Sequence, residues 1–98
     1  MTVISLLDLH VKADELDAVE GVLRSTLVAT RAFDGSLGVD VVVDVDDPAH
    51  YVLVERWQSI EHDDAYRAFR GTPEGASPLG ALMAEPPTLT RFTVADGV

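Results

Sequence analysis

The 98-residue sequence contains no cysteine, which excludes disulfide bonds and thiolate chemistry and is compatible with a reducing compartment. It also lacks any run approaching the roughly 18–20 consecutive apolar residues of a membrane span. The apolar run at residues 3–9 is short, contains Asp8 and has no basic start, so it does not match a signal peptide. We therefore expect a cytoplasmic protein that does not enter the membrane.

Basic residues are scarce as well. Seven Lys and Arg stand against seventeen Asp and Glu, which gives a formal net charge of −10, and the basic residues form no patch along the chain. Nucleic-acid binding requires many phosphate contacts from Lys and Arg, so this balance excludes nucleic acid and an anionic membrane surface as expected partners. Hydrophobic residues make up 47% of the chain, a normal share for a folded core. The length predicts a single domain, residues 1–98.

The hydrophobic pattern predicts an alternation of strands and helices. Period-two runs indicate strands, and an apolar stripe at spacings of three and four (Leu16, Val19, Leu23, Leu27) indicates a helix. The predicted elements are strand 2–11, helix 13–29, strand 36–45, strand 51–57, helix 59–69, short helix 78–85 and strand 88–94.

This order is that of the ferredoxin-like split βαβ fold, an α+β fold with two helices on one face of a four-stranded antiparallel sheet. The first two strands carry more apolar residues than two helices would cover. We therefore expect a homodimer in which the sheets of two copies pack face to face.

No metal site is expected from the sequence. Asp44, Asp46 and Asp47 cluster at a predicted hairpin tip, but the segment lacks the glycine and the distant glutamate of a Ca²⁺ loop. His10 and His50 are too isolated along the chain to indicate metal ligands. Asp8 and His10 share a face of the first strand, which we interpret as a solvent-exposed strand end.

The segment 46–59, DDPAHYVLVERWQS, joins a turn, a strand and the start of a helix. With the turn at residues 31–35 and the element order of nearly the whole chain, it resembles the antibiotic biosynthesis monooxygenase (ABM) domain of the dimeric α+β-barrel superfamily. The pattern Glu55-x-Trp57-x-Ser59 is the most specific part. The resemblance implies a ferredoxin-like fold, a homodimer with a β-barrel between the subunits, and cofactor-independent oxygenation of small phenol- or quinol-like aromatics.

One position departs from the pattern of the family. Most ABM-like sequences carry His nine residues after the Trp, where this chain has Tyr66, and its nearest histidine is His62, one helical turn earlier. The haem-degrading branch needs a histidine further along to bind iron. No histidine follows His62, so haem degradation is not expected.

The strand–helix corner at residues 51–69 supplies the candidate site. His62, Tyr66 and Phe69 share one helical face by their spacings of four and three. We predict His62 as the catalytic base and Tyr66 as the group that orients a phenol. Four further residues are predicted to bind the substrate, by aromatic packing or by attraction of an anion: Trp57, Phe69, Arg67 and Arg70.

Structural roles are the alternative for the same residues. Trp57 and Tyr66 suit a packed core, and His62 suits a solvated first helical turn, with Ser59 as the N-cap. Glu55 could make a structural hydrogen bond or ion pair with Arg56 or Arg91. The matching alternative function is a non-catalytic small-molecule binding module, or a structural dimeric module, of the same fold.

Overall fold

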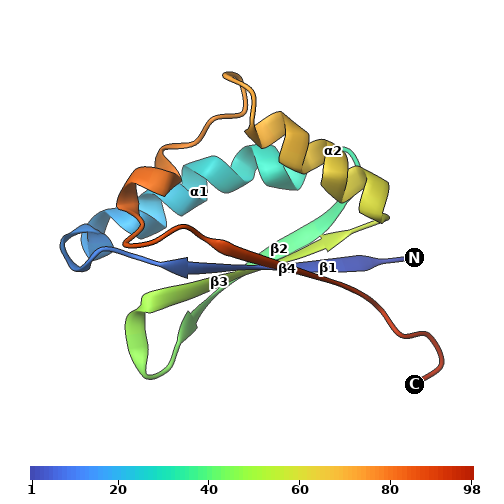
Figure 1. Cartoon of the computed structure of the whole chain (residues 1–98), viewed down its shortest axis with the longest axis horizontal. Helices are drawn as coiled ribbons and strands as arrows, with labels where there is room; N and C mark the ends of the chain where they lie inside the picture. Colours follow the sequence, from blue (N-terminus) through green and yellow to red (C-terminus); the bar gives the residue numbers. More distant parts are fainter.

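The computed structural model describes all 98 residues, and its elements follow the predicted order. In chain order they are β1 (Val3–His10), the 3-10 helix η1 (Ala13–Glu15), α1 (Leu16–Ala32), β2 (Ser36–Asp44), β3 (Asp47–Trp57), α2 (Ile60–Arg70), the 3-10 helix η2 (Pro78–Leu82) and β4 (Thr88–Thr93). All neighbouring strands are antiparallel, in the order β2-β3-β1-β4. Both helices lie on one face of the sheet (Figure 1). The predicted ferredoxin-like α+β fold is confirmed.

The β2–β3 hairpin is longer than predicted. β3 begins at Asp47, four residues before the predicted start at Tyr51, so the connection is a tight turn at residues 45–46. Aspartate side chains stabilise this tip: Asp44 accepts a hydrogen bond from the amide of Asp46, and Asp47 accepts one from the amide of Ala49. The acidic residues thus satisfy backbone donors and allow strand pairing to continue to the tip.

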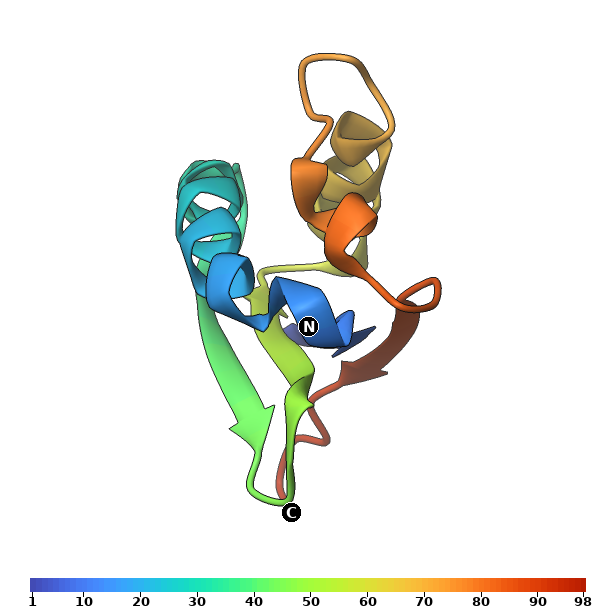
Figure 2. The same cartoon turned by 90° about the vertical axis from the view of Figure 1, so that its left-hand side faces the viewer.

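The main core lies between α1 and the sheet. The predicted stripe is confirmed, because Val19, Leu23 and Leu27 are all buried and pack with strand residues such as Leu9 and Leu53. Figure 2 shows α1 above the β2–β3 side of the sheet and α2 with η2 above the β1–β4 side. Each helix therefore has its own half of the sheet to cover.

Buried charged groups attach α2 to the sheet. The Asp63 carboxylate of α2 is fully buried, accepts a 2.9 Å hydrogen bond from Ser5 of β1 and pairs with Arg91 of β4 at 3.3 Å. Glu55 of β3 is also buried and accepts a hydrogen bond from the Trp57 indole, while its ion-pair partner is Arg67. The structural role expected for Glu55 is present, but with Arg67 in place of the expected Arg56 or Arg91.

The other face of the sheet carries apolar side chains that no helix covers. Cross-strand pairing places Leu6 opposite Val54 and Val42 opposite Val52 on this face, and Ile4 opposite Phe92. Phe92 is 50% exposed and Val42 is 46% exposed. We refer to the six residues Ile4, Leu6, Val42, Val52, Val54 and Phe92 as the open sheet face.

Candidate functional site

Tyr66 belongs to an aromatic cluster formed by Phe33, Trp57, Tyr66 and Phe69, in which Phe33 contacts the other three rings. The Trp57 and Tyr66 ring centroids are 4.9 Å apart, and Phe33 meets the Tyr66 ring edge-on at 5.3 Å. Phe69 lies 5.4 Å from Phe33. Trp57 and Tyr66 are both buried. The structure thus brings three of the predicted site residues together as a packed cluster.

Polar partners fix the Tyr66 hydroxyl. It shares a 2.6 Å hydrogen bond with the hydroxyl of Thr30 and accepts a 2.7 Å hydrogen bond from Arg70 Nε. Arg70 also donates to the backbone carbonyls of Thr26 and Gly75. The guanidinium carbons of Arg67 and Arg70 each lie 5.1 Å from the Tyr66 ring centroid. These contacts link α2 to α1 through one phenol group.

His62 contacts the turn between α1 and β2. Its Nδ1 lies 2.6 Å from the Ser59 hydroxyl, which also caps α2 as predicted by accepting from the His62 amide. Its Nε2 lies 3.7 Å from the Asp34 carboxylate. The ring packs so tightly over Gly35 that a Cβ at that position would lie 2.2 Å from His62 Cγ. His62 therefore holds the start of α2 against the α1–β2 turn.

Neither cavity of the molecule is lined by any of the six predicted site residues, His62, Tyr66, Trp57, Phe69, Arg67 and Arg70. Their roles in catalysis and substrate binding stay a prediction. One cavity, of about 330 Å³, is lined by Val3, Ile60, Arg91, Phe92 and Thr93. Its single charged group, Arg91, is already paired with Asp63 and Asp64, which raises the pKa of Arg91.

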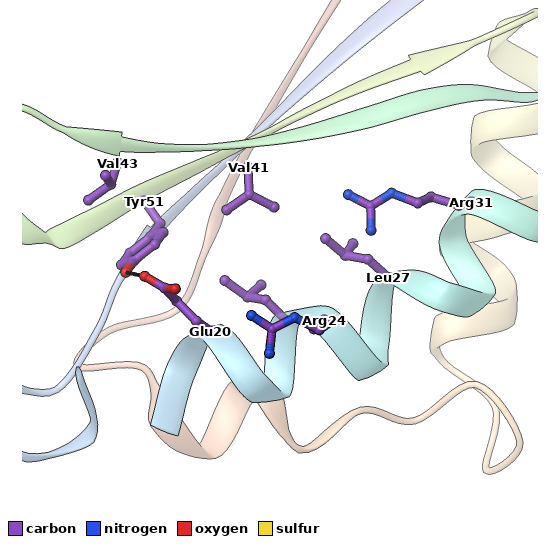
Figure 3. Close-up of a pocket in the computed structure, with 8 residues that line it drawn as sticks. Glu20, Arg24, Leu27, Arg31, Val41, Val43 and Tyr51 are labelled. Atoms are coloured by element: carbon purple, nitrogen blue, oxygen red, sulfur yellow. Dashed lines mark hydrogen bonds between the residues drawn. The ribbon is translucent and has the colours of Figure 1, made fainter. Parts of the chain in front are cut away.

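The other cavity, of about 290 Å³, lies between α1 and the β2–β3 half of the sheet, and we call it the α1 cleft. Figure 3 shows the side chains that reach into it from both sides. Its lining residues are Glu20, Leu23, Arg24, Leu27 and Arg31 of α1, Val41 and Val43 of β2, and Tyr51 of β3. The floor is apolar, and the charged groups all come from the helix.

A hydrogen-bonded pair of Tyr51 and Glu20 lies at the α1 cleft. The Tyr51 hydroxyl donates a 3.2 Å hydrogen bond to the Glu20 carboxylate, and burial together with that carboxylate raises the pKa of Tyr51. Tyr51 is therefore a hydrogen-bond donor at neutral pH and does not act as a base.

Two arginines of the cleft, Arg24 and Arg31, take part in none of the ion pairs of the molecule. Arg31 donates to the carbonyl of Val39 at 3.1 Å, which places its guanidinium beside β2. The cleft thus suits a small, largely apolar ligand that carries negative charge.

Comparison with protein-family models gives a match to the antibiotic biosynthesis monooxygenase (ABM) family over residues 2–75. The chain belongs to this family. Among solved structures, this ABM chain is similar to Rv0793 from Mycobacterium tuberculosis, with 25% identity, a TM-score of 0.80, and 98% and 97% of the two chains covered. It is also similar to a mutant of SnoaB, a cofactor-independent oxygenase from Streptomyces nogalater, with 18% identity, a TM-score of 0.82, and 99% and 96% covered. Comparison with curated protein sequences found no match.

The fold of this ABM chain contains no helix that is long and apolar enough to cross a membrane.

The site residues predicted from the sequence did not include any residue that lines the α1 cleft. Glu20, Arg24 and Arg31 are spaced by four and seven residues, so they lie beside the apolar stripe on one side of α1. That spacing indicates, from the sequence alone, a charged side of the helix next to its apolar stripe. Tyr51 can be placed in the cleft only when the register of β3 against β1 and β2 is known.

Proposed function

We propose that this ABM protein is a cofactor-independent monooxygenase that binds a small phenol- or quinol-like aromatic in the α1 cleft. The observation that carries the proposal is the pairing of an apolar floor with two arginines, Arg24 and Arg31, that have no carboxylate partner. Membership of the ABM family and likeness in fold to SnoaB, a cofactor-independent oxygenase, support the same activity.

In this proposal the cleft lowers the cost of making an electron-rich anion from the substrate. Two nearby guanidiniums favour the deprotonated substrate, because opposite charge stabilises the ionised form. The Glu20 carboxylate accepts the substrate proton, and Tyr51 holds that carboxylate through its hydrogen bond. The apolar floor formed by Leu23, Leu27 and Val43 keeps water from the reacting carbon.

The overall reaction balances without a further reductant. A substrate CH₂ group next to a phenol loses two hydrogens and becomes a carbonyl, with O₂ as the oxidant. One oxygen atom enters the product, the other leaves as water, and the organic anion supplies the electrons. An anthrone reacts in this way. A hydroquinone, which has no CH₂ group, gives a hydroxyquinone and water from the same O₂, with a ring C–H replaced by C–OH and the two phenols oxidised to carbonyls. An aromatic that cannot form a stabilised anion would not react.

Oxygen consumption tests this proposal. EDTA-treated protein is mixed with anthrone and hydroquinone substrates in an oxygen electrode, beside Arg31→Gln, Arg24→Gln and Glu20→Gln. We expect consumption by the wild type and at least about a tenfold loss of kcat/KM in each variant, because one charged contact is worth about 1.5–3 kcal/mol. No consumption by the wild type with any such substrate would overturn the proposal.

The prediction for the strand–helix corner is tested in the same assay. If His62 is the base and Tyr66 orients the phenol, then His62→Ala and Tyr66→Phe lose activity while cleft variants keep it. Thermal melting of each variant must accompany the assay, because both side chains also hold α2 in place. Loss of activity in a fully folded His62→Ala protein would favour the corner over the α1 cleft.

A non-catalytic binding module is the second candidate, and one observation favours it. No histidine lines the α1 cleft, so the cleft contains no side chain of the type that most often exchanges protons near neutral pH. Binding of an anionic aromatic to the wild type, weakened by Arg31→Gln and unaccompanied by oxygen consumption, would identify this function.

We also propose that two copies pack through the open sheet face. Six apolar side chains on this face would be buried by a second sheet, as in other face-to-face sheet packings. The helices cover the opposite face, which leaves the α1 cleft accessible from solvent in such a dimer.

A further inference from the structure

A group of histidine and carboxylate side chains lies at one end of the sheet, on the face that the helices leave uncovered. β1 and β3 pair so that His10 stands directly opposite His50. Their imidazole rings stack with centroids 4.7 Å apart and an interplanar angle of 2°. The two histidines that are 40 residues apart in sequence are thus neighbours in the fold.

Carboxylates surround the two rings. His50 Nε2 lies 2.7 Å from Asp8 Oδ1, and its Nδ1 lies 2.9 Å from Asp44 Oδ2. Glu85, in the connection between η2 and β4, approaches His10 Nε2 at 3.5 Å. The side chains are accessible, with exposed fractions of 25% for His50 and 44% for His10.

We propose that Asp8, His10 and His50 form a binding site for a divalent transition-metal ion of the Zn²⁺ type. One donor atom from each residue lies within 4.8 Å of the other two. Two imidazoles and one carboxylate are a preferred ligand set for Zn²⁺, and three protein ligands leave a fourth position for water or another ligand.

Metal binding requires an adjustment of the present arrangement. Donor atoms that now lie within 4.8 Å of one another must approach, and the two parallel imidazole rings must tilt so that both nitrogen lone pairs point to one ion. Tetrahedral Zn²⁺ with bonds of about 2.0–2.1 Å places its ligand atoms about 3.3 Å apart. The 2.7 Å contact between His50 Nε2 and Asp8 Oδ1 must therefore open by about 0.6 Å. The three side chains are partly exposed on a strand surface, where rotation about χ1 and χ2 is open to them.

Asp44 completes the arrangement from outside the ligand set. Its carboxylate accepts from His50 Nδ1 when the ring is the Nδ1–H tautomer, which leaves Nε2 free to bind an ion. Such carboxylate–histidine pairs are a regular outer layer of zinc sites. The surroundings favour a cation, since the carboxylates of Asp8 and Asp44 lie 2.7 Å and 2.9 Å from the two ring nitrogens of His50. None of the ion pairs in this group uses Lys or Arg to neutralise the carboxylates.

Titration calorimetry with ZnCl₂ on EDTA-treated, extensively dialysed protein tests the site. We expect saturable binding of one Zn²⁺ per chain, at least tenfold weaker in His10→Ala and Asp8→Asn. Asp44→Asn should weaken binding by about 10–100-fold, the usual effect of removing an outer-layer partner. The matched control is His62→Ala, which removes the third histidine of the chain at a position outside the group and should bind as the wild type does.

Co²⁺ provides a second measurement that does not depend on heat. The Co²⁺ complex should show the visible bands of a four-coordinate ion, and His10→Ala should lose them while its thermal melt stays unchanged. Absence of saturable binding would overturn the proposal and leave His50 as a histidine held by hydrogen bonds between two carboxylates. Equal affinity in the wild type, His10→Ala and Asp8→Asn would overturn it too, as would equal loss in His62→Ala.

Discussion

The two tyrosines of the chain are both buried, but their hydroxyl groups have different partners. The Tyr66 hydroxyl bonds to Thr30 and Arg70 inside the protein, whereas the Tyr51 hydroxyl bonds to the exposed Glu20 at the rim of the α1 cleft. One phenol therefore holds two helices together, and the other faces a space that a ligand can enter.

Removing the Tyr66 hydroxyl should destabilise the protein. Tyr66→Phe leaves Arg70 Nε without its partner and removes one of the two hydrogen bonds of the buried Thr30 hydroxyl, which costs about 1–3 kcal/mol. Chemical denaturation measures the change. Tyr51→Phe is the matched control and should cost at most about 1 kcal/mol, because Glu20 stays solvated. Equal losses in the two variants would contradict the assignment of Tyr66 to the connection between α1 and α2.

Tyr51 should ionise above the ordinary tyrosine range. Burial and the Glu20 carboxylate raise its pKa in the folded protein above the unfolded value of about 10. The neutral phenol therefore contributes stability that is fully present below pH of about 10 and is lost as the pH rises through the folded pKa. Tyrosinate absorbance of the wild type minus that of Tyr51→Phe isolates this group. A midpoint at or below the ordinary value would contradict the prediction.

At the scale of elements, the α1–β2 turn and the start of α2 depend on one glycine. Gly35 has a φ of +87°, and the His62 ring occupies the space where a side chain would lie. A left-handed backbone and close packing over the ring both favour glycine at this position. The turn and the helix start are therefore expected to form together.

Gly35→Ala should destabilise the protein by more than about 1 kcal/mol, because both the φ angle and the space disfavour a Cβ. Gly21→Ala provides the contrast. Gly21 lies inside α1 with nothing within 4 Å of a new Cβ, so alanine should stabilise by about 0.5–1 kcal/mol. Thermal or chemical denaturation measures both variants. A neutral Gly35→Ala would show that His62 moves away without cost.

The elements were predictable because their patterns are local. The apolar stripe of α1 and the Ser59 cap depend only on residues within a few turns of the same helix, and both are confirmed. The early start of β3 at Asp47 was missed, because Pro48 and three aspartates indicate a longer loop when read without the hydrogen bonds that their side chains accept.

The sites were less predictable because they depend on register. Nothing in the sequence alone states that His10 pairs with His50, or that Tyr51 lies beneath Glu20. The helical spacing of His62, Tyr66 and Phe69 was a sound reason to expect a common face, but spacing does not indicate whether that face borders a cavity or a packed cluster. Only the packing of α2 against Phe33 and Trp57 distinguishes these two cases.

At the scale of the whole molecule, the open sheet face predicts self-association. Light scattering should give a molar mass of twice the 10.5 kDa of one chain for the wild type. Phe92→Asp places a charge at a half-exposed position of the open sheet face, on the edge strand β4, and should shift the mass toward that of one chain. Val45→Asp is the control, because Val45 is 96% exposed at the hairpin tip and should leave the mass unchanged. A single-chain mass for the wild type would contradict the dimer.

The central claim is that substrate occupies the α1 cleft, and obstructing the cleft tests it most directly. Val43 lines the cleft and is 49% exposed, so Val43→Trp fills the space without disturbing the core, whereas Val45→Trp adds the same bulk at the hairpin tip. The measurement is the rate of oxygen consumption with an anthrone substrate, for variants whose thermal melts match the wild type. We predict at least a tenfold lower rate for Val43→Trp and a wild-type rate for Val45→Trp. A wild-type rate in Val43→Trp would contradict the assignment of the substrate to this cleft.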